Sequence, residues 1–200
     1  MAFFTPVPLH RDGLTLTPLT LAHAPGLAAA AADGELWTLR YTSVPEPGRE
    51  RAYIEYALKQ QVEGSRTPFA VVDDATGDVL GSTSYHDIVD EIRRVEIGYT
   101  WYAARAQRTR VNTTCKLMLL EYAFDVLDCN VVGWRTAGEN ERSQAAIAAL
   151  GAQRDGRVRR HGPDRDGGFR DTVFYSLLPG EWPAVRERLE ARLERHGGAE

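Results

Sequence analysis

The spacing of apolar residues along the chain predicts short helices and strands. Apolar and polar side chains alternate over residues 14–19, which predicts a first strand. Helical spacing follows and is interrupted by Pro25-Gly26 and by the segment 45–48, Pro-Glu-Pro-Gly. We therefore expect one strand and then two or three short helices, the last of which ends near Gly64.

The middle of the chain changes to a period of two residues. The runs 69–72 and 79–85 are rich in strand-forming residues, and the polar segment 73–78 between them has turn chemistry. They predict an antiparallel hairpin, and a third run over 94–101 is expected to pair with it. On this third strand the alternation predicts one face of Val95, Ile97, Tyr99 and Trp101 and an opposite face of Glu96, Gly98 and Thr100.

Helical spacing returns from Asn112 and predicts a long helix with Asn112 or Thr113 as its cap. The apolar stripe of this helix consists of Leu117, Leu120, Phe124 and Leu127. No repeat or long linker divides the chain, so we expect one α/β domain with a mixed sheet. The remaining expected elements are a strand at 131–134, a helix from Asn140 to Leu150 closed by Gly151, strands near 152–158 and 169–177, and an amphipathic helix at 182–196.

Composition and charge agree with a single globular domain. The 200 residues are 43% hydrophobic, and 24 Lys and Arg against 28 Asp and Glu give a net charge of -4. This balance excludes a generally basic surface, so we expect no nucleic-acid and no membrane partner. Cys115 and Cys129 lie too far apart on one helix for a disulfide, and no segment approaches the ~20 apolar residues that span a bilayer. A cytoplasmic protein is expected.

The segment from Arg105 to Thr114 is a polar loop that leads into the long helix. It places Arg105, Arg108 and Arg110 beside backbone N–H groups that have no intrahelical partner, where the helix dipole adds about half a positive charge. Phosphate or pyrophosphate suits such a place. A solvated loop with a polar cap is the other interpretation of the same residues.

Three motifs occur in this order of elements: Glu96-Ile97-Gly98-Tyr99, the loop Gln107-x-x-Arg110-x-Asn112, and Asn140-Glu141-Arg142-Ser143 followed by Leu150-Gly151-Ala152. With them, the chain from Leu14 to Leu178 resembles the GCN5-related N-acetyltransferases (GNAT), in particular the RimJ/RimL-like branch that acetylates protein N-termini and other primary amines. The resemblance implies one N-acetyltransferase domain over residues 1–200, with a mostly antiparallel seven-stranded sheet flanked by helices. It also implies an N-terminal arm (1–12) and a C-terminal helix and tail (180–200).

The same resemblance implies acetyl-CoA as donor, a primary amine as acceptor, direct transfer in a ternary complex, and a homodimer. One departure concerns the phosphate loop, because the family's first glycine is Arg110 here. This side chain could crowd the diphosphate or supply a replacement charge, and the three loop arginines favour retained CoA binding. The implied cofactor-binding residues are Ile97, Tyr99, Trp101, Arg105, Gln107, Arg108, Thr109, Arg110, Val111, Asn112, Thr113, Asn140 and Arg142.

Acetyl transfer requires a base, because an alkylammonium with a pKa near ~10 must first lose a proton. Glu96 is the candidate, and its alternative is an exposed cross-strand partner for Arg93 or Arg94. The resemblance implies that backbone amides of 97–101 hold the acetyl oxygen. It also implies that Ser143 protonates the departing thiolate, and the alternative for Ser143 is a first-turn residue bonded to backbone.

The acceptor site has Trp37, Tyr41 and Tyr85 as candidate lining residues, in competition with ordinary packing. The five histidines are scattered without metal-ligand spacing, so no metal is expected. A function of another class also fits the sequence: a catalytically silent acyl-CoA-binding or interaction module of the same fold whose phosphate loop has drifted.

Overall fold

The computed structural model describes residues 6–197 and contains one mixed sheet. Within these residues the sheet has eight strands in the order β1-β2-β3-β4-β5-β6-β8-β7, and only the β5–β6 neighbours are parallel. The strands are β1 (Leu9–Arg11), β2 (Leu14–Pro18), β3 (Arg66–Asp73), β4 (Val79–Val89), β5 (Arg94–Tyr102), β6 (Val131–Ala137), β7 (Gln153–Pro163) and β8 (Phe169–Leu177). The helices are α1 (Ala24–Ala32), α2 (Glu50–Val62), α3 (Val111–Glu121), α4 (Glu141–Leu150) and α5 (Trp182–Gly197).

The expected mixed, mostly antiparallel sheet is confirmed, but it has one strand more than the expected seven. The additional strand is β1, which pairs Leu9–Arg11 with Leu14–Leu16 of β2 through a tight turn. Part of the expected N-terminal arm therefore belongs to the sheet, while residues 1–5 of the arm and 198–200 of the tail lie outside the described residues.

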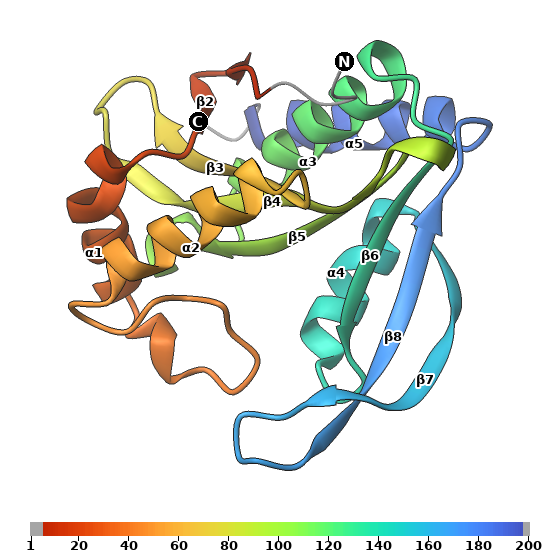
Figure 1. Ribbon diagram of the computed structural model, residues 1–200. Coiled ribbons are helices and arrows are strands. Elements are labelled where there is room, and N and C mark those ends of the chain that lie inside the picture. Colours follow the sequence, from red (N-terminus) through yellow and green to blue (C-terminus); the bar gives the residue numbers. More distant parts are fainter. Residues whose placement is uncertain (1–5, 198–200) are drawn as a thin grey trace.

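Helices cover both faces of the sheet. Figure 1 shows α1 and α2 on one face and α3 and α5 on the other. A smaller apolar cluster packs under α1 and α2, and a larger one fills the space between the sheet and α3, α4 and α5. Within residues 6–197, no helix is long and apolar enough to cross a membrane.

The parallel pairing of β5 with β6 covers only three residues of each strand, and the two strands then separate. It pairs Arg94–Glu96 only with Val131–Gly133, although both strands continue for several residues. Figure 1 shows the two strands starting side by side and running apart. Beyond Glu96 and Gly133 their facing backbone groups do not pair with each other, so the opening offers hydrogen-bonding groups to a ligand.

A β-bulge interrupts β5 inside this opening. Ser82 pairs with Trp101 and Ser84 with Gly98, so two residues of β5 oppose one residue of β4. Tyr99, at the bulge, has a left-handed φ of 51°. The single apolar face expected for β5 is therefore wrong beyond Ile97: Trp101 packs in the α1–α2 cluster and Tyr102 in the other.

The helix ends differ in how well local sequence marks them. Asn140 caps α4 as expected, with its side chain accepting from the Ser143 backbone N–H at 3.1 Å, and Gly151 ends the helix with φ 103°. The expected caps of α3 are wrong, because the helix begins at Val111 after Arg110 and so contains Asn112 and Thr113. The expected apolar stripe of α3 is buried, and both cysteines are free and buried.

Candidate active site

Glu96 lies at the point where β5 and β6 separate. Its side chain is buried and its Oε2 accepts a hydrogen bond from Arg135 Nε at 2.7 Å, while His86 Nε2 lies 3.8 Å from the same oxygen. The alternative of an exposed partner for Arg93 or Arg94 is wrong. Arg94 pairs instead with Asp87, and Arg93 donates to backbone carbonyls near the start of β6.

Burial shifts the protonation of this pair in opposite directions. It raises the pKa of Glu96 above its usual value, against the opposing effect of Arg135. Burial and the nearby Arg135 lower the pKa of His86 to about 4. At neutral pH the imidazole is therefore uncharged, and Glu96 is a stronger proton acceptor than an exposed carboxylate.

Two glycines make room for these side chains. A Cβ on Gly133 would lie 3.0 Å from Glu96 Cγ, and one on Gly98 would lie 2.3 Å from His86 Nε2. Glu96 therefore lies over the backbone of β6, which explains how it reaches Arg135 two residues further along that strand. The sequence pattern did not single out Arg135 or His86, because their proximity to Glu96 depends on strand register.

The backbone of the expected phosphate loop is helical at Arg110 and left-handed at Arg108. Arg110 has helical dihedral angles (φ -64°, ψ -21°), so the residue that replaces the family's glycine needs no unusual conformation. Arg108 takes the left-handed position instead, with φ 61°. Thr109 accepts the Val111 N–H through its hydroxyl at 3.2 Å, and the next amides of the first turn have no intrahelical acceptor.

The three loop arginines have different partners. Arg105 forms ion pairs with Asp33 and Asp78, each at 3.3 Å, so its charge is largely offset. The Arg110 guanidinium donates to the backbone carbonyl of Asp12 in the β1–β2 turn. Arg108 is exposed and takes part in none of the ion pairs found within residues 6–197. The positive charge open to an anion is smaller than the sequence suggests.

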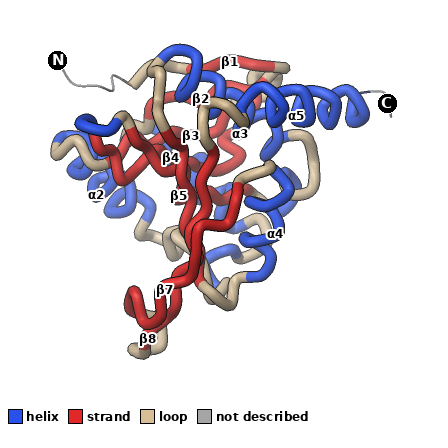
Figure 2. The backbone as a smooth tube through the Cα atoms, turned by 90° about the vertical axis from the view of Figure 1, so that its right-hand side faces the viewer, coloured by secondary structure: helices blue, strands red, loops and turns tan. Residues whose placement is uncertain are grey.

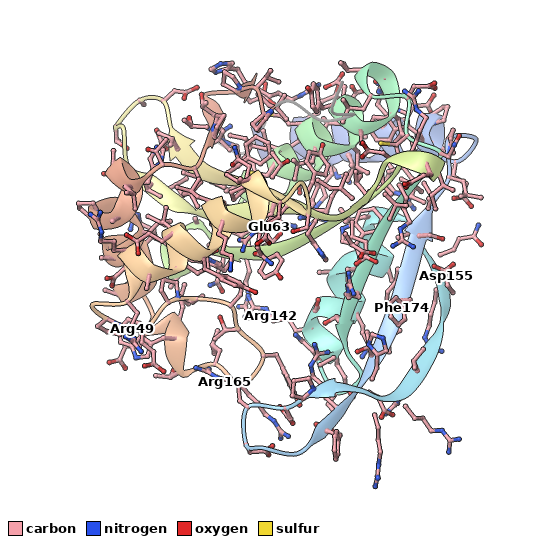
Figure 3. The ribbon with its side chains drawn as sticks, in the orientation of Figure 1. Arg49, Glu63, Arg142, Asp155, Arg165 and Phe174 are labelled. Atoms are coloured by element: carbon pink, nitrogen blue, oxygen red, sulfur yellow. The ribbon has the colours of Figure 1, made fainter. Side chains whose placement is uncertain are left out.

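A hydrogen-bond bridge connects the starts of α3 and α4. Arg142 donates to Gln107 Oε1 at 2.7 Å, and Gln107 donates to the Tyr102 carbonyl at 2.8 Å. Figure 3 shows Arg142 reaching from α4 toward the space between α2 and β6. Gln107 of the loop and Arg142 of α4, two of the expected cofactor-binding residues, thus meet, and half-buried Ser143 lies in the first turn of α4.

The expected acceptor residues separate into two groups. Tyr41 donates to Glu139 Oε2 at 2.6 Å, and Trp37 packs at the edge of the α1–α2 cluster. Tyr85 is a correction: it is fully buried, packs edge-on to Phe69, and donates to the Leu119 carbonyl of α3. Its hydroxyl is therefore used inside the core and does not line an acceptor pocket.

The loop 33–49 contacts the tip of the β7–β8 hairpin, which projects from the body in Figure 2. Arg40 pairs with Asp164 at 2.8 Å, and Arg165 donates to the carbonyls of Trp37 and Leu39, each at 3.0 Å. This loop–hairpin contact joins segments more than 120 residues apart in sequence. Within the described chain, no group of three or more His, Cys, Asp or Glu residues is arranged to hold a metal ion.

Comparison with known proteins agrees with this geometry. The sequence profile of the acetyltransferase (GNAT) domain matches residues 13–153. YdaF of Bacillus subtilis (strain 168), whose name assigns it as a ribosomal N-acetyltransferase, is 35% identical over 106 residues, which are 53% of this chain and 57% of YdaF. The match thus spans a little over half the length of that relative.

Solved structures resemble the whole chain. A protein of T. thermophilus that is assigned to the acetyltransferases is 34% identical, with a TM-score of 0.81 over 95% of this chain and 98% of its own. RimJ of Mycobacterium smegmatis, solved in complex with CoA-disulfide, shares the fold with a TM-score of 0.75 over 93% of each chain, at 20% identity. The chain belongs to the GNAT family of acetyltransferases.

Proposed function

We propose that the protein is an acetyl-CoA-dependent N-acetyltransferase that transfers the acetyl group directly to a primary amine in a ternary complex. The observation that carries the proposal is the opening between β5 and β6 with buried Glu96 at its closed end. The family supplies the reaction class, and this opening supplies a place where donor and acceptor can meet from the two faces of the sheet.

The residues around the opening fit acetyl-CoA. Beyond Glu96, the edge of β5 has N–H and C=O groups that can pair with the amides of a pantetheine arm, as an added strand would. The first-turn amides of α3 and the exposed Arg108 suit the phosphates, and the Gln107–Arg142 bridge lies between the loop and α4.

Each proposed step belongs to a residue of the chain. Glu96 accepts a proton from the attacking ammonium, so that the amine nitrogen can form its bond to the acetyl carbon. Backbone amides of 97–101 donate to the acetyl oxygen as negative charge develops on it. Ser143 donates its hydroxyl proton to the sulfur as the carbon–sulfur bond breaks, and the second proton released by the acylated nitrogen restores the Ser143 hydroxyl, which leaves a neutral amide and the CoA thiol.

The acceptor is proposed as a primary amine of a protein N-terminus or of a small molecule. The name of YdaF, which refers to the ribosome, supports the protein class. The loop 33–49 and the β7–β8 hairpin, which contact each other, are the segments proposed to bind this acceptor. The family resemblance also supports two further proposals, a homodimer and a cytoplasmic location. Light scattering tests whether the protein is a dimer.

Calorimetry with acetyl-CoA, followed by thiol-release assays, tests the function. The assays use peptides with free or blocked N-termini, polyamines and aminoglycosides. Glu96→Gln and Ser143→Ala should each lower kcat by about 10²–10⁴-fold, the range for general acid–base groups. Unchanged turnover in either variant removes that residue's role, and no binding at millimolar acetyl-CoA removes the enzyme proposal.

A catalytically silent acyl-CoA-binding module remains the second candidate. The observation in its favour is that Asp33 and Asp78 offset Arg105, while Arg110 is held by the Asp12 carbonyl. Acetyl-CoA binding with no thiol release over the whole amine panel would select this candidate.

A further inference from the structure

Two buried cations lie on opposite faces of the sheet at the β5 bulge. Arg66, at the start of β3, is 1% exposed and lies on the α2 face. Lys116, on α3, is 6% exposed and lies on the other face. Neither side chain takes part in any ion pair found within residues 6–197, and a buried charge without a counter-charge is rare in proteins.

Arg66 holds the ring of Tyr99. Its guanidinium carbon lies 3.7 Å from the centre of that ring, a cation–π distance. The guanidinium donates to Ser84 Oγ at 2.9 Å, to Gln60 Oε1 at 3.3 Å and to the Tyr53 hydroxyl at 3.3 Å. All of these partners are neutral, so the hydrogen bonds satisfy the donors without cancelling the charge.

Lys116 holds the next residue from the opposite face. Its Nζ donates to Thr100 Oγ1 at 3.1 Å, and that oxygen lies 2.7 Å from Thr83 Oγ1. The two residues of β5 that form the bulge, Tyr99 and Thr100, are therefore each fixed by one buried cation. Tyr99 is also the residue with the left-handed φ, a conformation that needs support from its surroundings.

Fold stability does not explain this pair of charges. Moving a cation from water into a protein interior is unfavourable, and an apolar side chain of similar volume avoids that penalty. Burial accordingly lowers the pKa of Lys116 to about 8, which leaves it mainly charged at pH 7. In a low-dielectric interior such charges act over longer distances than at the surface.

We propose that Arg66 and Lys116 are positioning residues that hold the β5 bulge and together create the positive potential that stabilises the acyl oxyanion there. The inference rests on the proposed function, which places that oxygen at the amides of 97–101. As the amine forms its bond to the acetyl carbon, the carbonyl electron pair moves to oxygen. It returns when the thiolate leaves, and both cations keep their protons throughout.

Kinetics of neutral variants test this. Arg66→Met and Lys116→Met should each lower kcat at least tenfold, with the KM and Kd for acetyl-CoA changed less than twofold. Arg51→Met is the matched control, because Arg51 is an exposed cation on α2 with an ordinary surface ion pair, and it should leave kcat unchanged. Arg66→Lys keeps the charge and should recover most of the lost kcat.

A spectroscopic measurement separates an electrostatic role from a purely structural one. The stretching frequency of a ¹³C-labelled acetyl carbonyl should fall when labelled acetyl-CoA binds the unsubstituted protein, and this fall should shrink in both Met variants. Lys116→Met should fold with an unchanged or raised Tm, since it removes a buried charge. It therefore tests the inference even if Arg66→Met does not fold.

Failure of this inference and failure of the proposed function give different results. A folded Lys116→Met variant with unchanged kcat and unchanged carbonyl frequency overturns this inference. If the unsubstituted protein neither binds acetyl-CoA nor releases thiol, the proposed function fails before the roles of Arg66 and Lys116 are reached.

Discussion

Glu96 and His86 lie side by side, and burial raises the pKa of the first and lowers the pKa of the second. The carboxylate is moved toward its neutral form by a raised pKa, and the imidazole toward its neutral form by a lowered one. Arg135 opposes the first shift and adds to the second, because it favours an anion and disfavours another cation. At neutral pH Glu96 can therefore act as a base beside an uncharged His86, whereas the same two residues at the surface would form an ion pair at mildly acidic pH.

His86 should make the fold sensitive to acid. Its folded pKa of about 4 lies below the usual 6.5, so the unfolded chain binds a proton that the folded chain does not. The stability that comes from keeping His86 neutral in the fold is fully present above pH 6.5 and is lost as the pH falls toward 4. Between pH 7.5 and 4.5 we expect a loss of about 2–3 kcal/mol in the free energy of unfolding from this group.

Urea denaturation at several pH values measures this loss, with His86→Gln as the comparison. The variant should lose less stability on acidification by roughly that amount. The raised pKa of Glu96 acts in the other direction in both proteins and cancels in the comparison. Equal acid sensitivity in the two proteins would contradict the assignment.

At the scale of elements, the loop–hairpin contact connects parts of the chain that local structure does not bring together. Arg165 binds two backbone carbonyls of the loop 33–49 and lies 3.7 Å from Glu46, and Figure 3 shows it near that loop. Arg40 crosses in the other direction to Asp164. Both side chains are about half exposed, so the contact is polar and can open.

Arg165→Ala should loosen the loop 33–49 without disturbing the donor site. Hydrogen exchange over residues 37–46 should become faster, and the KM for the acceptor should change by about twofold to tenfold, since one hydrogen bond contributes about 0.5–1.5 kcal/mol. The Kd for acetyl-CoA should stay within twofold. Arg159→Ala, on the same hairpin, is the control, and equal effects of both substitutions would reject the contact as the cause.

Elements with local signals were predictable from sequence, whereas contacts between them were not. Asn140 and Gly151 mark the ends of α4, and the structure confirms both ends, because capping depends on neighbouring residues. The bulge at Tyr99 depends on Arg66 and His86 from other strands, so alternation alone placed Trp101 on the wrong face. The prediction of Tyr85 as a site residue failed because its burial likewise depends on contacts with other elements, Phe69 of β3 and Leu119 of α3.

At the scale of the whole molecule, the sheet consists of two groups of strands. Only three residue pairs connect these groups within the sheet. One group is β1–β5 and the other is β6–β8, and the shared ladder contains only Arg94–Glu96 with Val131–Gly133. Helix α3 and the chain that follows it connect the same two groups covalently. A ligand that pairs with both open edges would add hydrogen bonds between the groups.

Acetyl-CoA should therefore stabilise the protein globally. At a concentration one hundred times its Kd, the expected gain in unfolding free energy is about 2.7 kcal/mol. Hydrogen exchange should slow on both β5 and β6 beyond their shared ladder, and a thermal-shift titration measures the gain. Protection confined to the α3 loop would mean that the ligand binds by its phosphates alone.

The short β5–β6 ladder also has a kinetic consequence. If the pantetheine arm completes the sheet between the two groups of strands, spent CoA leaves only when strand-like hydrogen bonds on both sides break together. Breathing of the sheet would then control the departure of product, and turnover would slow with solvent viscosity even if acyl transfer itself were fast.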